Sequence, residues 1–351
     1  MTNIYEIAKE VSLSPTTVSL VLNGKGDQYR IAKKTQERIY KTAREMGYVA
    51  NVSARRLVSN RISVYPEVAL LWSPTQHPNV LNNFISILHK LEEEQQIQPF
   101  NVTIYPFRNG ALDELEFLLT SNLVHGIIIP PARDEDIEYL KGCSYQVPAI
   151  LQYGVVEGCY TVMVDNEKNG RDVADIFQAR GFKRVGILEP GYVSRTAMER
   201  SRSFIMRCEE NGMTLCYHGG EVQTTEMSRS NLSRYGAEMS LDLLKQKKLP
   251  EALFVQNDQV ALGVISTLIL NGVRIPEDIS IICYGHTPDQ FIVWPGPGLT
   301  LINYPLEEIA EKTIRLMSEL LVGNPVKEKI FVCASNIEFS DSCTKPADWT
   351  L

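Results

Sequence analysis

Short apolar runs alternate with helical patterns through most of the chain, and this alternation restricts the fold more than any other feature. Segments such as VLNNFISILHKLEEE and VADIFQARGF have helical periodicity and lie between runs that have the composition of buried strands. Those runs are EVALLWS (67–73), NVTIYPF (101–107), GIIIPP (126–131), VPAILQY (147–153), RVGILE (184–189), EALFVQ (251–256) and ISIICY (279–284). Continuously apolar strands separated by helices predict parallel sheets covered on both faces. We therefore predict an α/β body of two doubly wound lobes.

Two places in this body have the composition of connections between the lobes. TVMVDNEKNG (161–170) is predicted to be the first crossing, and the return crossings are predicted within 283–305. A two-lobed domain then spans 62–343, with one lobe at about 62–163 and 288–322 and the other at about 164–287 and 323–343. Ligands of such folds bind at the carboxyl ends of the strands. The predicted binding site is therefore a cleft between the lobes.

The first 47 residues contain three short helical patterns. In the first pattern the apolar residues recur at i, i+3, i+4 and i+7, as Ile4, Ile7, Ala8 and Val11. The second starts with Ser14 as N-cap and Pro15 at the first helical position, and it ends at Asn23. The third runs from about Thr35 to Met46. Two helices joined by a tight turn, with a third helix closing the core, predict a helix-turn-helix domain over 1–47.

The second of these helices, in the stretch SPTTVSLVLN, has two different faces. Val18, Val21 and Leu22 lie on one side of a helical wheel, while Thr16, Ser19 and the large apolar Leu20 lie opposite. Residues 1–61 carry a net charge of +6 and the remainder −13, which points to a polyanionic partner at this end. A three-helix module that docks on a protein is the alternative.

This head closely resembles the DNA-binding domain of the lactose-repressor/galactose-repressor (LacI/GalR) family of bacterial transcription regulators. The similarity rests on TNIYEIAKEVSLSPTTVSLVLNGKG and on KKTQERIYKTAREMGY. It implies a second helix in the major groove of operator DNA and a following loop near phosphates. The DNA-binding residues expected in the head are Ser14, Thr16, Thr17, Ser19, Leu20, Asn23, Lys25, Arg30 and Lys33. The family usually has Arg at position 20; because Leu cannot make a bidentate contact to guanine, we expect a different operator centre.

Residues 48–61, YVANVSARRLVSNR, resemble the hinge segment of the same family. The resemblance implies a segment that folds on DNA, with Leu57 wedged into the minor groove and Arg55 near a phosphate. Ala50 stands where the family usually has Pro. A plain surface linker is the alternative.

The body resembles the same family, and through it the periplasmic sugar-binding proteins. The matching segments include GFKRVGILE, FVQNDQVALGVISTLILNGVRIPEDISIICYG and LTLINYPLEEIAEKTIRLMSELLVGNP. The residues expected to contact an effector are Trp72, Arg200, Asn257, Asp258 and His286. Gly285 replaces the acidic residue that commonly contacts sugar hydroxyls in the family. Either His286 substitutes for it, or the ligand differs from a sugar.

The sequence has no motif of the main catalytic classes, and its five His residues have no metal-ligand spacing. No apolar run is long enough to span a membrane, and the N-terminal residues lack the apolar core of a secretory signal. The seven scattered cysteines favour a reducing compartment. We predict a cytoplasmic, non-enzymatic, homodimeric transcription repressor without metal or cofactor. It would bind a double-stranded DNA operator and a sugar or related metabolite. The alternatives are a solute-binding protein without DNA function and a DNA-binding regulator that has lost its effector.

Overall fold

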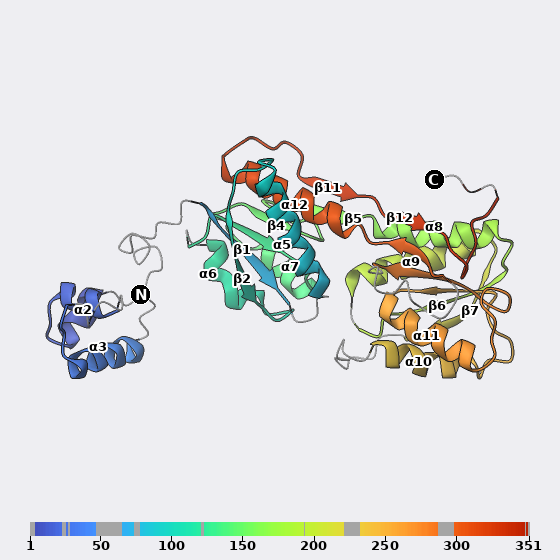
Figure 1. Cartoon of the computed structure of the whole chain (residues 1–351), viewed down its shortest axis with the longest axis horizontal. Coiled ribbons are helices and arrows are strands. Elements are labelled where there is room, and N and C mark those ends of the chain that lie inside the picture. The colour runs from blue at the N-terminus through green and yellow to red at the C-terminus, as the bar shows by residue number, and fades with distance from the viewer. Residues whose placement is uncertain are drawn as a thin grey trace. The chain divides into compact units, whose positions relative to one another are not determined.

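The computed structural model describes residues 4–22, 26, 29–46, 65–73, 78–120, 123–192, 194–220, 232–286, 298–347 and 349. The chain divides into two compact units, residues 1–66 and residues 67–351 (Figure 1). The predicted hinge, 48–61, lies outside the described residues. None of the described helices combines the length and the apolar content that crossing a membrane requires.

The first unit contains three short helices: α1 (Ile4–Glu10), α2 (Pro15–Leu22) and α3 (Lys33–Glu45). Their buried core consists of Ile7, Ala8, Val11, Val18, Val21, Ile39 and Ala43. Leu22 was predicted to be buried but only packs at the margin of this core, together with Leu13, Ile31 and Met46. The unit thus has the helix-turn-helix arrangement that the periodicity predicts.

The first lobe of the second unit is built on a six-stranded sheet in the order β11-β5-β4-β3-β1-β2. Its strands are β1 (Glu67–Trp72), β2 (Asn101–Pro106), β3 (Gly126–Ile129), β4 (Ala149–Leu151), β5 (Tyr160–Val164) and β11 (Ile330–Cys333). Its helical segments are α5 (Pro78–Glu93), η1 (Leu112–Leu115), α6 (Glu116–Thr120), α7 (Asp134–Lys141) and α12 (Leu306–Leu321). All the pairings within this sheet are parallel.

The second lobe is built on another six-stranded sheet, in the order β12-β10-β9-β8-β6-β7. Its strands are β6 (Arg184–Leu188), β7 (Thr214–Gly219), β8 (Ala252–Val255), β9 (Ser280–Gly285), β10 (Thr300–Asn303) and β12 (Asn336–Glu338). Its helices are α8 (Asn166–Ala179), α9 (Arg195–Glu210), α10 (Leu232–Leu243) and α11 (Asp258–Leu270). Only β12 is antiparallel to its neighbour. Helices cover both faces of the sheet, and two hydrophobic clusters fill the spaces between (Figure 1).

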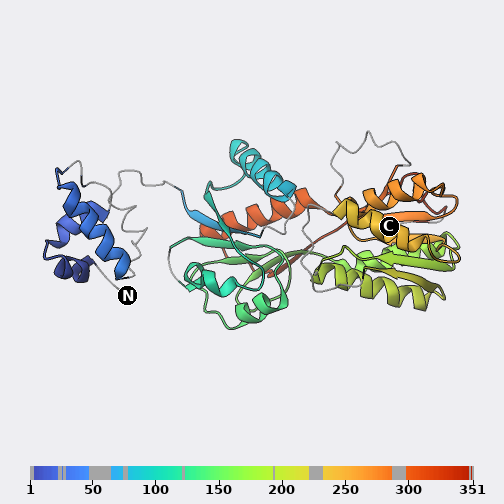
Figure 2. The same cartoon turned by 90° about the horizontal axis from the view of Figure 1, so that it is seen from below.

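The strand pairing corrects two of the predicted lobe boundaries. Residues 300–303 were assigned to the first lobe, but β10 pairs with β9 in the second sheet. Residues 330–333 were assigned to the second lobe, but β11 pairs with β5 in the first sheet. The chain therefore crosses between lobes at 164–166, 303–306 and 333–336, along the path visible in Figure 2. The error arose because short strands that pair only with distant segments have no local signal of which sheet they join.

Candidate functional site

In the first unit, α2 has one buried face and one accessible face. Val18 and Val21 are buried, while Thr17, Ser19 and Leu20 are partly exposed and Thr16 is exposed. Ser14 caps the helix, because its Oγ accepts a hydrogen bond from the Thr17 backbone N–H at 3.0 Å. The capping prediction for Ser14 is therefore confirmed, and Ser14 is itself exposed.

Other polar contacts determine how the helices of this unit meet. The Arg38 guanidinium of α3 donates to the Val11 carbonyl in the turn before α2, at 3.1 Å. Buried Gln36 donates to the Ile31 carbonyl at 2.7 Å. Arg30 and Lys33 are exposed, as expected for residues that approach phosphates. Four predicted DNA-binding residues lie outside the described residues: Asn23, Lys25, Arg55 and Leu57.

Sequence reasoning overlooked two exposed aromatic residues of this unit. Tyr5 on α1 is 74% exposed and Tyr29 before α3 is 56% exposed. Large aromatic side chains with a hydroxyl commonly donate to phosphates, so their exposure is the signal that could have identified them.

In the second unit, Arg200 of α9 lies at the carboxyl end of the second sheet and is almost completely buried. Its Nε donates to Gln256 Oε1 at 3.1 Å, and its Nη1 donates to Asn166 Oδ1 at 2.6 Å. The guanidinium carbon lies 3.6 Å from the centre of the Tyr284 ring. Burial raises the pKa of the Tyr284 hydroxyl, and the Arg200 charge opposes that rise. The ring face and two amide oxygens thus stabilise a buried positive charge.

A buried carboxylate is linked to this arginine through Gln256. Glu189, which directly follows β6, accepts hydrogen bonds from Gln256 Nε2 at 3.1 Å and Ser201 Oγ at 2.6 Å. His218 Nε2 lies 3.1 Å from the same carboxylate. Because Gln256 accepts from Arg200 and donates to Glu189, its amide orientation is determined by its partners. Sequence reasoning missed Glu189, Gln256, Asn166 and Tyr284, although each lies at or just after the carboxyl end of a buried strand.

Three other predicted effector residues of this lobe are held by local contacts. Asn257 caps α11, with its Oδ1 accepting from the Val260 N–H at 3.0 Å. Asp258 Oδ2 accepts from the His286 N–H at 3.2 Å, and His286 Nδ1 lies 3.3 Å from Asn303 Oδ1. A Cβ at Gly285 would lie 2.7 Å from the Asp258 Cβ, so a side chain at 285 would collide with Asp258. Asp258 therefore occupies part of the space beside residue 285.

The wall formed by the first lobe is less polar. Trp72 ends β1 and lines a cavity of about 10 Å³ together with Leu81, Phe84 and Gln152, so no more than one water fits there. Tyr153 follows β4 and is buried; burial raises the pKa of its hydroxyl, and Glu199 of α9 raises it further. Arg195 of α9 forms an ion pair with Asp134 of α7 at 2.7 Å and lies 5.7 Å from the Tyr153 ring centre. These contacts join the carboxyl ends of the two sheets, where the cleft was predicted.

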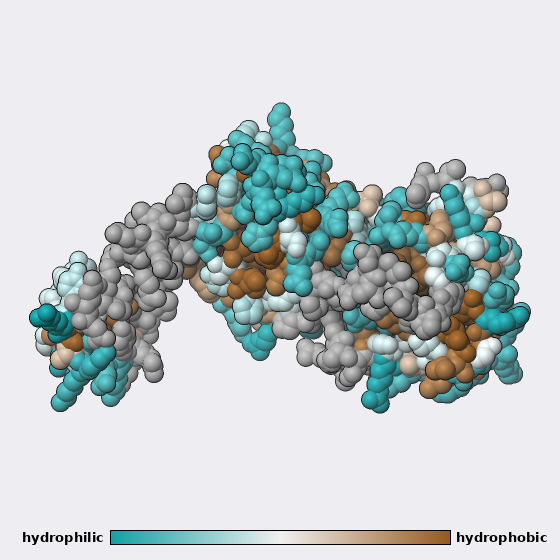
Figure 3. Space-filling model, in the orientation of Figure 1, coloured by the Kyte–Doolittle hydropathy of each residue, from teal (hydrophilic) through white to brown (hydrophobic). Residues whose placement is uncertain are grey.

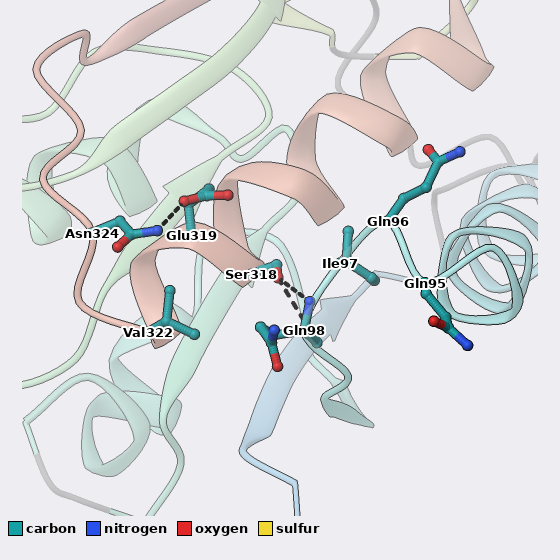
Figure 4. A pocket seen from close by; sticks show the side chains of 8 residues that line it. All are labelled: Gln95, Gln96, Ile97, Gln98, Ser318, Glu319, Val322 and Asn324. Atoms are coloured by element: carbon teal, nitrogen blue, oxygen red, sulfur yellow. Dashed lines mark hydrogen bonds between the residues drawn. The ribbon is translucent and has the colours of Figure 1, made fainter.

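A larger cavity of about 300 Å³ lies near the amino ends of β2 and β11 in the first sheet (Figure 4). Its lining comes from the segment after α5, Gln95–Gln98, and from the end of α12, Ser318, Glu319, Val322 and Asn324. The surface over this end of α5 is mostly hydrophilic (Figure 3). Among the described residues, no group of three or more His, Cys, Asp or Glu side chains could hold a metal ion.

Comparisons with known proteins agree with both halves of this description. The family model of bacterial regulatory proteins, lacI family, matches residues 3–51. The periplasmic binding protein-like domain matches residues 174–338. The HTH-type transcriptional repressor PurR of Mannheimia succiniciproducens is 25% identical over 336 residues, which are 94% of this chain and 95% of that protein.

Two solved structures extend the similarity to the fold. A LacI family transcription regulator from Clostridium acetobutylicum has a TM-score of 0.67 and 27% identity, covering 78% of this chain and 99% of its own. The lac repressor dimer bound to operator and the anti-inducer ONPF has a TM-score of 0.66 and 19% identity, covering 98% of this chain and 99% of its own.

A helix-turn-helix unit joined to a two-lobed body, with a buried polar network at the carboxyl end of the second sheet, defines the class of this protein, a DNA-binding transcriptional regulator with an effector-binding domain. The chain thus combines a helix-turn-helix domain that matches the lacI family of bacterial regulatory proteins with a periplasmic binding protein-like domain.

Proposed function

We propose that this regulator is a repressor that reads its operator with α2. The supporting observation is the two-faced helix: Val18 and Val21 are buried, which leaves Thr16, Thr17, Ser19 and Leu20 for base edges. Ser14, Asn23, Lys25, Arg30 and Lys33 would contact the flanking backbone. Arg55 would lie near a phosphate, and Leu57 would insert into the minor groove.

Binding of the full-length protein to DNA, measured as a function of salt, tests this proposal. Sites are first selected from genomic fragments, and affinity is then measured at several salt concentrations. We expect the logarithm of the affinity to fall linearly with the logarithm of salt concentration, because bound phosphates release counterions. Failure to bind any duplex at low salt would leave the body as a solute-binding protein.

Leu20 is proposed to meet an apolar feature of a base, such as a thymine methyl, where the family usually has Arg. Leu20→Arg should shift operator preference toward guanine at one position in each half-site. A bidentate Arg–guanine contact contributes about 1–3 kcal/mol of discrimination. Selection from random duplexes compares this variant with Leu20→Met, which keeps the apolar character and should keep the original preference. Unchanged preference in the Arg variant would refute the assignment.

We propose that the cleft binds a sugar or related metabolite that controls DNA affinity. Arg200 supports this role, since its Nε and Nη1 hold protein partners while no described residue accepts a hydrogen bond from its Nη2. Trp72, Asn257, Asp258 and His286 are the other proposed contacts. A thermal-shift screen with metabolites tests the site, because a ligand of the folded state raises the melting temperature. If no metabolite stabilises the protein, a regulator without an effector is favoured.

We further propose that the protein acts as a homodimer in the bacterial cytoplasm and catalyses no reaction. The similar lac repressor structure is a dimer on its operator. Exposed apolar residues on α10 and α11 (Leu241, Ile269 and the 85% exposed Leu270) support burial of this surface against a second copy. Light scattering at micromolar concentration should give twice the chain mass of 39.6 kDa. The Leu270→Asp variant should weaken the dimer, and a monomeric wild-type protein would contradict the proposal.

A further inference from the structure

The contacts of Arg200 reach beyond the cleft to the segments that join the lobes. Its Nη1 donates to Asn166 Oδ1, and Asn166 Nδ2 in turn donates to the Val164 carbonyl at 3.2 Å. Val164 is the last residue of β5, where it pairs with Cys333 of β11 in the first sheet. A single buried amide therefore connects an arginine of the second lobe to the first crossing.

A second route leads from Arg200 to the second crossing. The Tyr284 ring under the guanidinium lies 6.3 Å from the Tyr304 ring, edge to face. Tyr304 directly follows β10, and its backbone N–H donates to the Gly285 carbonyl at 2.9 Å. Its side chain packs against the hydrophobic cluster of the first lobe and also against that of the second lobe. The ring of Tyr304 thus touches both lobes at the point where the chain passes between them.

The helix that carries Arg200 is also held against the third crossing through α8. A Cβ at Gly170 would lie 2.1 Å from Ser203 Oγ and 2.3 Å from the Arg200 carbonyl, so α8 and α9 are in backbone contact there. Asn169 of α8 donates from its Nδ2 to the Oγ of Ser335 at 3.0 Å. Ser335 lies in the crossing between β11 and β12. Each of the three crossings is therefore connected to α9 through one intervening residue or helix.

We propose that Arg200 is a positioning residue of the interlobe hinge, and that a ligand bound to its remaining N–H groups acts on the crossings through Asn166 and Tyr284. An arginine has five N–H donors, of which the described residues use two. A ligand oxygen, from a hydroxyl or an anion, can bind to the remaining donors. It shifts the equilibrium between two arrangements of the lobes by the difference between its binding free energies for the two arrangements. This regulatory role rests on the effector site proposed above, whereas the hinge contacts themselves do not.

Hydrogen exchange of the full-length protein, without any ligand, tests the hinge role. In Arg200→Met, backbone amides at 164–168 and 303–307 should exchange about tenfold faster, because the hydrogen bond to Asn166 and the contact with the Tyr284 ring are lost. The amides of β6 and β8 should lose less protection than those at the crossings, because the backbone hydrogen bonds between these strands are not made by Arg200. The matched control is Arg207→Met on the same helix, whose partners Asp175 and Glu210 lie away from the crossings.

If Arg200→Met does not fold, the variant Asn166→Ala tests the same hinge role. It should speed exchange at 303–307 as well as at 164–168, because both crossings depend on the same arginine. The double variant should exceed neither single variant, as expected for residues acting in one chain of contacts. Unchanged exchange at the crossings, equal acceleration in β6 and β8, or additive effects would each overturn the proposal. A failed metabolite screen would count against the effector site and leave this result standing.

Discussion

The two lobes share one architecture, yet the carboxyl ends of their sheets, which we call the lobe walls, differ in chemistry. The second-lobe wall is a connected set of buried polar groups, in which Gln256 links Arg200 to Glu189. The first-lobe wall has Trp72 beside a small apolar cavity and the buried ring of Tyr153. Buried, mutually bonded polar groups hold their positions, which favours recognition of polar ligand atoms. The less polar wall is better suited to covering a ligand than to orienting it.

The two lobes also differ in how closely their elements pack at glycine residues. In the second lobe, α8 meets α9 at Gly170, and α10 meets α11 at Gly236 and Gly263, where an added Cβ would strike backbone atoms. In the first lobe, a Cβ at Gly126 would meet only side-chain atoms of α12, and the two nearest belong to the thioether end of Met317. The second lobe is therefore expected to tolerate change less well, and four predictions test this difference.

The largest effect is expected from Glu189→Leu in the second-lobe wall. The change leaves Ser201, Gln256 and His218 without their shared acceptor. Breaking such a buried charged network costs about 3–5 kcal/mol. Urea unfolding measures the loss, with the exposed Glu209→Leu on α9 as control, expected within about 0.5 kcal/mol of wild type. A loss below about 1 kcal/mol for Glu189→Leu would contradict the account of this wall.

The next effect compares one glycine from each lobe. Gly170→Ala forces α8 away from the backbone of α9 and should cost about 1–3 kcal/mol. Gly126→Ala should cost less than this, because the flexible Met317 side chain can move aside. Thermal unfolding of the two variants under one condition tests the order. Equal losses would show that the lobes do not differ in tolerance.

As the pH falls, the second lobe should lose stability before the first lobe does. Hydrogen bonds from Arg274 lower the pKa of Asp278 to about 2, and backbone N–H groups of Lys183 and Arg184 lower the pKa of Glu251. A carboxylate with a lowered pKa stabilises the fold above its unfolded value, near pH 4, and this contribution is lost as the pH falls through the folded value. Hydrogen exchange between pH 5 and pH 2 should show β8 and β9 losing protection before β1 and β3. Asp278→Asn should reduce this difference, and simultaneous loss in both lobes would argue against it.

The smallest effect is expected at the ion pair that joins the two walls. Arg195 and Asp134 are 43% and 75% exposed, so Arg195→Met should change the unfolding free energy by less than about 1 kcal/mol. Scattering of X-rays in solution should nevertheless show a slightly larger radius of gyration, since one contact across the cleft is gone. Asp134→Asn should behave in the same way. The exposed pair Arg234–Glu238 on α10 provides a control whose loss leaves the radius unchanged.

The sequence by itself determined the class of fold and most of its elements. Apolar runs predicted β1, β3, β4, β6, β8 and β9 because strands buried on both faces are continuously apolar. The same pattern predicted β2, although this edge strand is only partly buried. Helical spacing with Ser14 and Pro15 predicted the helix-turn-helix, because caps and periodicity are local properties. Four of the five predicted effector residues lie at the carboxyl edge of the second sheet and Trp72 at that of the first. Their contact with a ligand stays a prediction.

Only the tertiary structure decided which sheet the short late strands join and how the cleft wall is connected. β10 and β11 contain four residues each. β11 pairs with β5, which is more than 160 residues earlier in the sequence, and β10 pairs with β9, which ends at Gly285. Glu189, Gln256 and Asn166 each follow a strand, and nothing local distinguishes them from ordinary turn residues. They acquire their roles because α9 brings Arg200 to all of these strand ends at once, and no sequence pattern records such long-range proximity.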